Sequence, residues 1–386
     1  MQDKLYIITK NDLFDLFARL AQTSRVFVPY SYDGKFHPPS QSVSDREGAS
    51  ADSRASGYSS FYFGEFDPSK EPAVELGGIR QSQPFRSFLN PAREKVMGKE
   101  KNDARLALYP SEASGTRPVI VAGVKACDLS SLVLQDYVFL KGDREDPFYA
   151  FHRNNTLIIS CDCTYAKETC FCIAMAGKPY PTKNFDLNLS SQDSFFVVEV
   201  GSVKGRAVVN NYKTFFKDCK NKDLSGRDGM REKVGLQVKD FIEKRETPDT
   251  TAINGNMKKS YDNLPLWQDA ASTCVECGAC NLVCPTCHCF LLFDERTRQE
   301  ISRGKVWDSC LYKTFAKVAG NHNPRKHLHE RIRNRFDKKF AFFPEVLDYF
   351  ACTGCGRCIE ACPGNIDIRE VLKGIVTGKW NKPPHD

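Results

Sequence analysis

Two short apolar runs, each rich in β-branched residues, stand out in the first part of the chain. Arg117–Val124 and Asn155–Ser160 have the composition of strands that are buried on both faces of a sheet. The stretch Asp128–Leu140 between them has a helical pattern. Strand, helix and strand in this order form a βαβ unit. The pattern therefore predicts an α/β domain with a partly parallel sheet over residues 1–250.

Other stretches of this region have weaker patterns. Phe195–Val200 and Gly205–Val209 are candidates for further strands. Residues 30–60 combine turn-forming residues with little hydrophobic periodicity, which indicates a long surface loop or lid. Residues 216–258 are highly charged and end in the breaker-rich Asn254-Gly-Asn, so we expect an exposed helix followed by a linker.

From about Leu264 the pattern changes to helical stretches separated by runs of cysteine. We therefore place a second, α-helical domain at residues 251–386. Two domains suit the length of 386 residues, since single cores rarely extend beyond roughly 100–200 residues. Apolar residues at 41% and charged residues at 27% are typical of folded globular proteins, which excludes a disordered or fibrous chain.

The seventeen cysteines are the most informative feature of the composition. The N-terminus lacks the apolar core of a signal peptide, and no apolar run approaches the length that spans a membrane. We expect a cytoplasmic protein without direct membrane insertion. Disulfides rarely persist in that compartment, so the cysteines indicate metal ligation. Deprotonated thiolate ligands would offset the formal charge of +7, which weakens any inference of nucleic-acid binding.

Eight cysteines form two runs with the same spacing, C-x2-C-x2-C-x3-C-P. The first run contains Cys274, Cys277, Cys280 and Cys284, and the second contains Cys352, Cys355, Cys358 and Cys362. In this spacing three thiolates hold one [4Fe–4S] cluster and the fourth ligates the neighbouring cluster. A zinc site is disfavoured, because zinc ligands are commonly drawn from two separated cysteine pairs.

The exchange rule assigns the ligands of two [4Fe–4S] clusters. One cluster takes Cys274, Cys277, Cys280 and Cys362, and the other takes Cys352, Cys355, Cys358 and Cys284. The insert between the runs, Pro285–Ala351, is far longer than in a compact ferredoxin and its pattern is helical. This combination predicts a ferredoxin-type domain of the α-helical kind.

Two features of the insert, its basic stretch and its surplus cysteines, each allow more than one interpretation. The basic stretch His322–Lys339 suits a solvated face or a docking surface for an acidic partner, and no nucleic-acid motif accompanies it. Cys287, Cys289 and Cys310 fit neither cluster. They are interpreted as buried thiols, with a three-cysteine site completed by His288 as the alternative. Cys161 and Cys219 are interpreted as unligated.

Motifs spread over most of the chain resemble one family. The first cysteine run continuing into Cys284-Pro-Thr-Cys-His-Cys, then Trp307-Asp-Ser-Cys, His322-Asn-Pro-Arg and the second run resemble the iron–sulfur beta subunit of soluble sulfhydrogenases. The A subunit of anaerobic sulfite reductase is similar. In the N-terminal part, Arg86-Ser-Phe-Leu-Asn-Pro, Ala126-Cys-Asp-Leu and Cys170-Phe-Cys resemble the same family.

The resemblance implies an electron-transfer subunit without catalytic residues of its own. Its partners would be a flavoprotein subunit that oxidises NAD(P)H and a catalytic subunit of the hydrogenase, sulfite reductase or another reductase type. No glycine-rich dinucleotide fingerprint follows a strand, so we expect flavin and NAD(P)H to bind elsewhere. The alternative is a cluster-based reductase that itself acts on a disulfide or sulfur substrate.

A third [4Fe–4S] cluster is predicted in the N-terminal domain. Cys127 and Cys163 each follow a predicted strand, and parallel strands of a right-handed βαβ unit end at the same edge of the sheet. The intervening loop is long enough to return Cys170 and Cys172 to that edge, whereas a strand would point Cys161 into the core. A zinc site or free thiols are the alternatives, and the family resemblance favours the cluster.

Overall fold

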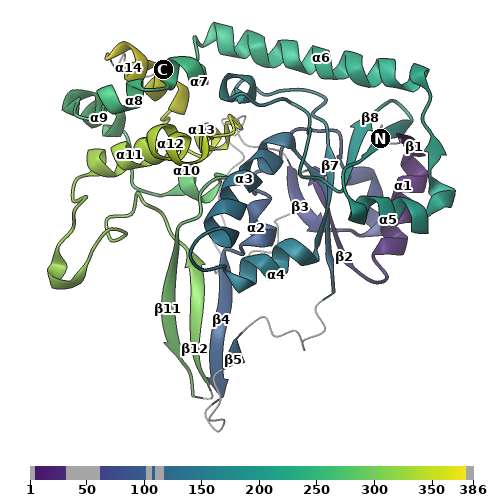
Figure 1. The fold of residues 1–386 in the computed structure, drawn as a ribbon, viewed down its shortest axis with the longest axis horizontal. Coiled ribbons are helices and arrows are strands. Elements are labelled where there is room, and N and C mark those ends of the chain that lie inside the picture. The colour runs from purple at the N-terminus through teal and green to yellow at the C-terminus, as the bar shows by residue number, and fades with distance from the viewer. Residues whose placement is uncertain (1–4, 32–60, 101–106, 109–116, 299, 380–386) are drawn as a thin grey trace, which may run out of the picture.

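The computed structural model describes residues 5–31, 61–100, 107–108, 117–298 and 300–379. Most of the predicted loop or lid at residues 30–60 lies outside this part of the chain. In the described N-terminal region a mixed sheet of eight strands has the order β10-β1-β9-β8-β7-β6-β2-β3 (Figure 1). The strands are β1 Tyr6–Thr9, β2 Arg25–Ser31, β3 Phe61–Glu65, β6 Val119–Val124, β7 Thr156–Cys161, β8 Leu187–Ser191, β9 Phe195–Val200 and β10 Lys217–Asp218.

The centre of this sheet is parallel and both of its sides are antiparallel. Strands β2, β6, β7 and β8 pair in parallel, while β3, β9, β1 and β10 are added in antiparallel pairs. The prediction of an α/β region with a partly parallel sheet is therefore confirmed. The helices of this region are α1 Lys10–Leu20, α2 Arg86–Leu89, α3 Ala126–Leu140, α4 Pro147–Asn155, α5 Val203–Asn211 and α6 Asn221–Lys244.

Alternating residues of the parallel strands pack into two apolar cores, one on each face of the sheet. Ile120 and Ile159 pack in one core with α1 and α5, whereas Val121 and Ile158 pack in another with α2, α3 and α4. This alternation is the period of two expected of a strand that is buried on both faces. Helices on both sides thus hold β6 and β7 in place, and their carboxyl ends lead directly to Cys127 and Cys163.

One strand prediction was wrong. Gly205–Val209 belongs to helix α5, where the Ser202 hydroxyl accepts a hydrogen bond from the backbone N–H of Gly205 at 3.1 Å. Serine at this position caps the first turn of a helix. A short apolar run cannot be assigned to strand or helix by periodicity alone, and here the cap decides.

The second part of the chain is mainly helical and is built around the fully buried Trp267. Its indole N–H donates to the carbonyl of Ser260 at 2.9 Å, and its ring packs against Phe336. Figure 1 shows α6 running along the top of the molecule from the sheet to this helical region. The helices are α7 Thr250–Ile253, α8 Asn256–Lys259, α9 Leu264–Ala271, α10 Ala279–Leu282, α11 Leu328–Asp337, α12 Phe343–Leu347, α13 Arg357–Glu360 and α14 Ile368–Thr377.

Short 3₁₀ and π segments complete the described elements. The 3₁₀ turns are η1 Pro68–Ala73, η2 Cys172–Met175, η3 Lys213–Phe215 and η4 Ala319–Asn321. Helix α11 continues into a π-helical turn, η5 Lys338–Phe342, and then into α12. Such turns frequently occur at functional sites, and η5 carries Lys339, which contacts a cysteine.

A second sheet joins the two parts of the chain. Its order is β11-β12-β4-β5, with β4 Arg93–Glu100, β5 Ala107–Leu108, β11 Phe290–Arg296 and β12 Glu300–Trp307. The β11–β12 hairpin comes from the insert between the cysteine runs, so the helical prediction for that insert was wrong in this segment. Because β12 pairs with β4, its partner is remote in sequence and no local pattern indicates it. The predicted boundary near residue 250 stays a prediction, and this sheet crosses it.

Candidate metal centre

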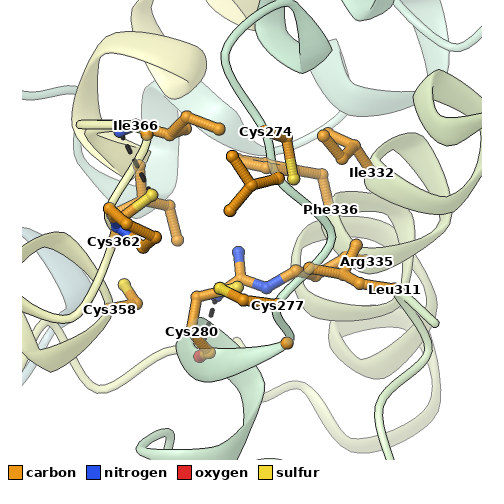
Figure 2. Close-up of a pocket in the computed structure, with 15 residues that line it drawn as sticks. Cys274, Cys277, Cys280, Leu311, Ile332, Arg335, Phe336, Cys358, Cys362 and Ile366 are labelled. Carbon is orange, nitrogen blue, oxygen red and sulfur yellow. Dashed lines mark hydrogen bonds between the residues drawn. The ribbon is translucent and has the colours of Figure 1, made fainter.

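The first cysteine run surrounds a hollow in the helical region, here called hollow A. Cys274, Cys277 and Cys280 reach it from the loop before α10 and the start of that helix, and Cys362 reaches it from the turn after α13 (Figure 2). The remaining lining is largely apolar and includes Phe336. The structure thus brings together the three predicted ligands of the first run and the exchanged fourth ligand of the second.

Thiol group B consists of the other four predicted ligands of the dicluster region, which are Cys284, Cys352, Cys355 and Cys358. Burial, with a smaller contribution from the neighbouring thiols of Cys284 and Cys355, raises the pKa of the Cys352 thiol to about 12 although the positive charge of Lys339 lowers it. Burial also raises the pKa of Cys358, which lies near the same three cysteines. The exchanged Cys284 therefore lies among the cysteines of the second run.

Hollow C is lined by the four cysteines predicted for a third site, which are Cys127, Cys163, Cys170 and Cys172. Cys127 lies in the first turn of α3 after β6, and Cys163 follows the parallel neighbour β7. The loop from residue 164 returns the chain so that Cys172 begins η2. Cys161 lies instead in the apolar core of the sheet, where burial raises its pKa to about 12.

Glycines with positive φ allow the second cysteine run to pack against the loop of hollow C. A Cβ added at Gly354 would lie 2.5 Å from the carbonyl oxygen of Phe171, and one at Gly356 would lie 2.3 Å from that of Thr169. The backbone N–H of Phe171 donates to the carbonyl of Gly354 at 2.8 Å. Only glycine combines this close approach with φ values of 62° and 76°.

The three cysteine sites are contiguous. Cys358 of thiol group B also lines hollow A, and Cys355 of thiol group B also lines hollow C. Thiol group B therefore lies between the two hollows. The order C, B, A runs from the sheet edge into the helical region.

Four buried cations lie among the cysteines without a carboxylate partner in the described part of the chain. Arg86, Lys125, Arg335 and Lys339 are each no more than 6% exposed. Their hydrogen bonds go to backbone carbonyls, an amide, a hydroxyl and a sulfur. An uncompensated buried charge is costly, so negative charge is required in their surroundings. Thiolates that ligate iron would supply it, and this donor set fits iron–sulfur clusters.

Lys339 is directed at a single sulfur. Its ammonium lies 3.4 Å from Cys284 Sγ and 2.8 Å from the Thr286 hydroxyl, which itself lies 3.1 Å from the same sulfur. A hydrogen bond with Cys287, together with the nearby positive charge of Lys339, holds the pKa of Cys284 well below its usual value. Cys284 is therefore the cysteine whose thiolate form the surrounding side chains stabilise most.

The other cations serve different sites. Arg335 lies at hollow A, where it donates to the Asn281 side chain at 2.8 Å and reaches the hollow from α11 (Figure 2). Lys125 lies beside hollow C and donates to the carbonyl oxygens of Leu76 at 2.7 Å and Asp162 at 3.2 Å. Burial lowers the pKa of Arg86 to about 10, so this side chain stays protonated at neutral pH.

Two further buried arginines connect the sheet region to the second cysteine run through ion pairs. Arg80 pairs with Glu360 at 2.6 Å, and Arg357 pairs with Asp128 of α3 at 2.7 Å. Burial opposes the charge of Arg357, but Asp128 and two neighbouring cysteines raise its pKa above the usual value. Breaking such a buried pair leaves an uncompensated charge, so these contacts position the two regions relative to each other.

The buried cations were missed by the sequence analysis. The stretch His322–Lys339 was interpreted as a solvated face or a docking surface for an acidic partner, but Arg331, Arg335 and Lys339 are buried. Their spacing of four residues places them along one side of α11 and η5, next to Ile332 and Phe336. A cation repeated at the helical period beside apolar residues is the signal that indicates this burial.

The surplus cysteines of the insert gather around one buried amide. The Asn281 side chain donates to Cys310 Sγ at 3.2 Å, and Cys287 Sγ lies 3.6 Å from its carbonyl oxygen. Burial raises the pKa of Cys289 to about 11, with Cys310 nearby. None of these three cysteines lines hollow A or hollow C. Burial lowers the pKa of His288 to about 4, so its ring is neutral at pH 7.

No three Cys, His, Asp or Glu side chains in the described ranges converge closely enough to hold a single metal ion. No helix in that part of the chain is long and apolar enough to cross a membrane.

Comparison with known proteins agrees with this geometry. The sequence model of a family described as "4Fe-4S dicluster domain" matches residues 273–366, which contain both cysteine runs. Cysteine-lined hollows, buried cations and this match define an iron–sulfur protein. The chain is also 31% identical over 306 residues to "Sulfhydrogenase 2 subunit beta" of Pyrococcus furiosus, covering 79% of this chain and 86% of that protein. The chain belongs to the sulfhydrogenase beta-subunit family.

The contact between the second cysteine run and the loop of hollow C is tested by Gly356→Ala, with Gly378→Ala as the matched control. Both glycines have φ above 70°, but an added Cβ meets nothing within 4 Å at Gly378. The control should cost only the strain of a left-handed residue, about 1 kcal/mol. Gly356→Ala should also displace the loop at Thr169, lowering the unfolding temperature further and reducing the iron content per chain. Equal effects of the two substitutions would contradict the packing role.

Proposed function

We propose that this chain is the electron-transfer subunit of a multi-subunit oxidoreductase. It relays electrons between a flavoprotein subunit that oxidises NAD(P)H and a catalytic subunit of the hydrogenase, sulfite reductase or another reductase type. The observation that carries the proposal is the continuous row of thiol sites, in which Cys355 and Cys358 each border a neighbouring hollow. Electron transfer through a protein requires redox sites that lie next to one another. A protein that uses a metal site only for binding needs a single site.

The proposed ligands follow the exchange rule of two-cluster ferredoxins. Hollow A holds one [4Fe–4S] cluster through Cys274, Cys277, Cys280 and Cys362, and thiol group B holds a second through Cys284, Cys352, Cys355 and Cys358. The helical surroundings of these cysteines support the α-helical ferredoxin-type assignment. Hollow C holds a third through Cys127, Cys163, Cys170 and Cys172. A bound cluster supplies one-electron redox chemistry at each site.

The protein's own residues set the conditions for that chemistry. The buried cations stabilise thiolate ligands, and the apolar lining of hollow A, including Leu311, Ile332 and Phe336, limits access of water. Hydrogen bonds to cluster sulfurs and local charge tune reduction potentials. Lys339 and Thr286 at Cys284 therefore raise the reduction potential of the site in thiol group B.

The partners and the compartment follow from the same assignment. Flavin and NAD(P)H belong to a partner subunit, because the chain has no dinucleotide fingerprint. Free thiolates and clusters persist in reducing surroundings, which supports a cytoplasmic location of the complex. The division into an α/β domain over residues 1–250 and a cluster domain over residues 251–386 is part of the proposal.

The relay function is tested by comparing the isolated chain with its native complex. We expect the isolated, anaerobically purified chain to show no NAD(P)H oxidation with a viologen dye as acceptor, because it has no hydride-accepting site. The native complex can be purified through a tag on this chain. Adding NAD(P)H to it should reduce the clusters of the chain, which is measured as bleaching of their visible absorbance. Robust turnover by the isolated chain would refute the relay assignment.

The third cluster is tested by iron analysis. The purified chain should hold roughly 12 iron atoms with three [4Fe–4S] clusters and roughly 8 with two. Cys170→Ser should reduce the count by about 4 atoms, because it removes a ligand from hollow C. Cys161→Ser is the control and should leave the count unchanged, since Cys161 lies in the apolar core. A wild-type value near 8 that Cys170→Ser does not alter would remove the third cluster.

The role of Lys339 is tested by Lys339→Met, with the exposed Lys338→Met as the control for loss of one charge. A unit charge acting over roughly 7 Å at an effective dielectric constant of about 20 contributes about 2–3 kcal/mol, on the order of 100 mV. Removing Lys339 should therefore lower the potential of the cluster in thiol group B by about that amount. Redox titration followed by electron paramagnetic resonance measures it. Equal shifts in the two variants would show that Lys339 has no special role.

A further inference from the structure

The row of thiol sites has one end at the molecular surface. All seventeen cysteines lie in the described residues, and Cys277 of hollow A is the one that is exposed. Val275 beside it is 62% exposed, which is unusual for a valine that borders a buried, largely apolar hollow. Hollow A therefore offers the one exposed cysteine of the row to a redox centre that approaches from outside.

A basic segment borders this exposed end. Residues 309–329 contain Lys313, Lys317, Arg325 and Lys326 together with three histidines, and they contain no Asp or Glu. Lys313, Lys317 and Lys326 are exposed, and Val318 among them is 56% exposed. Figure 1 draws most of this segment as the light-green loop that projects from the helical region on the left.

The segment is attached to hollow A at both ends. Leu311 lines the hollow, and the Tyr312 hydroxyl donates to the carbonyl of Cys277 at 3.4 Å. At the other end Arg331 donates to the carbonyl oxygens of Leu311 at 3.0 Å and Lys326 at 2.8 Å. The exposed lysines thus belong to a loop that is anchored beside Cys277.

Two carboxylates beside this face are already engaged by this chain. Glu276, next to Cys277, pairs with the buried Arg331 at 2.8 Å. Glu330 accepts a hydrogen bond from the backbone N–H of His327 at 2.7 Å and caps α11. The lysines of the loop are left as an excess of positive charge, with the exposed side chain of Val318 among them.

We propose that this face, formed by Val275, Cys277 and the loop 309–327, is the docking surface for an acidic redox partner, the subunit that exchanges electrons with the cluster of hollow A. This inference rests on the proposed function. It identifies hollow A as the end of the relay at which electrons enter or leave the chain. Protein interfaces combine exposed apolar side chains with polar and charged ones, and this face offers Val275 and Val318 together with the loop lysines. Complementary charge steers association and fixes the orientation of the partner, which a directional electron transfer requires.

The first test maps this face in the native complex without any substitution. Acetic anhydride labelling followed by mass spectrometry should show Lys313 and Lys317 protected in the complex relative to the free chain. A zero-length carbodiimide should couple the same lysines to carboxylates of one redox subunit. Equal labelling in the complex and the free chain, or ultraviolet cross-linking of this loop to nucleic acid instead of protein, would overturn the proposal.

The second test uses charge reversal. Lys313→Glu/Lys317→Glu should slow cluster reduction within the reconstituted complex by about tenfold or more at low salt, and the difference should shrink as salt rises. The matched control is Lys213→Glu/Lys217→Glu at the far edge of the eight-stranded sheet, where both lysines are exposed. An unchanged rate in the first variant, or an equal loss in both, would overturn the proposal.

Failure of the proposed function gives a different result. Both variants must first show the iron content and unfolding temperature of the wild-type chain, since neither pair of lysines contacts a cysteine site. A wild-type chain without clusters, or a wild-type complex in which NAD(P)H does not reduce them, would refute the relay itself. A working relay with an unprotected loop would refute only the docking surface.

Discussion

The arrangement of the whole molecule depends on the compensation of buried positive charge by cysteine thiolates. Arg86, Lys125, Arg335 and Lys339 are enclosed by protein and form no ion pair with a carboxylate among the described residues. Burial of a charge without compensation costs several kcal/mol, which a marginally stable fold cannot tolerate at four positions. The cysteines, with the negative charge that ligation gives them, therefore belong to the stabilising interactions of the fold as well as to its chemistry.

This compensation requires segments from the whole chain. Arg86 lies in α2 of the N-terminal region, yet its guanidinium donates to the carbonyl of Cys284 at 2.8 Å and lies over the ring of Trp307. Arg357 in the second cysteine run pairs with Asp128 on α3. With the shared second sheet, these contacts place the sheet region and the helical region against each other. Hollow C exists only because of that contact, since Cys355 and Gly354 form part of its lining.

The row of sites also has a direction that follows from burial. The cysteines of hollow C and thiol group B are buried or half-buried, while Cys277 of hollow A is exposed. Thiol group B lies in the middle and receives the most hydrogen bonds to a single sulfur, at Cys284. In a relay, such a site holds the electron between the two ends, and the protein controls its potential through Lys339 and Thr286.

The cysteine spacing by itself determined the dicluster region, because three thiolates on a tight turn and a Cys-Pro at a helix start are local geometry that a short segment specifies. The βαβ pattern was likewise local, and it correctly placed Cys127 and Cys163 at one sheet edge. Tertiary structure alone decided which strands remote in sequence pair with each other, such as β12 with β4. It also buried Arg335 and Lys339. The sequence gives the positions of the cations along a helix, but only packing decides which face of the helix lies against the thiolates.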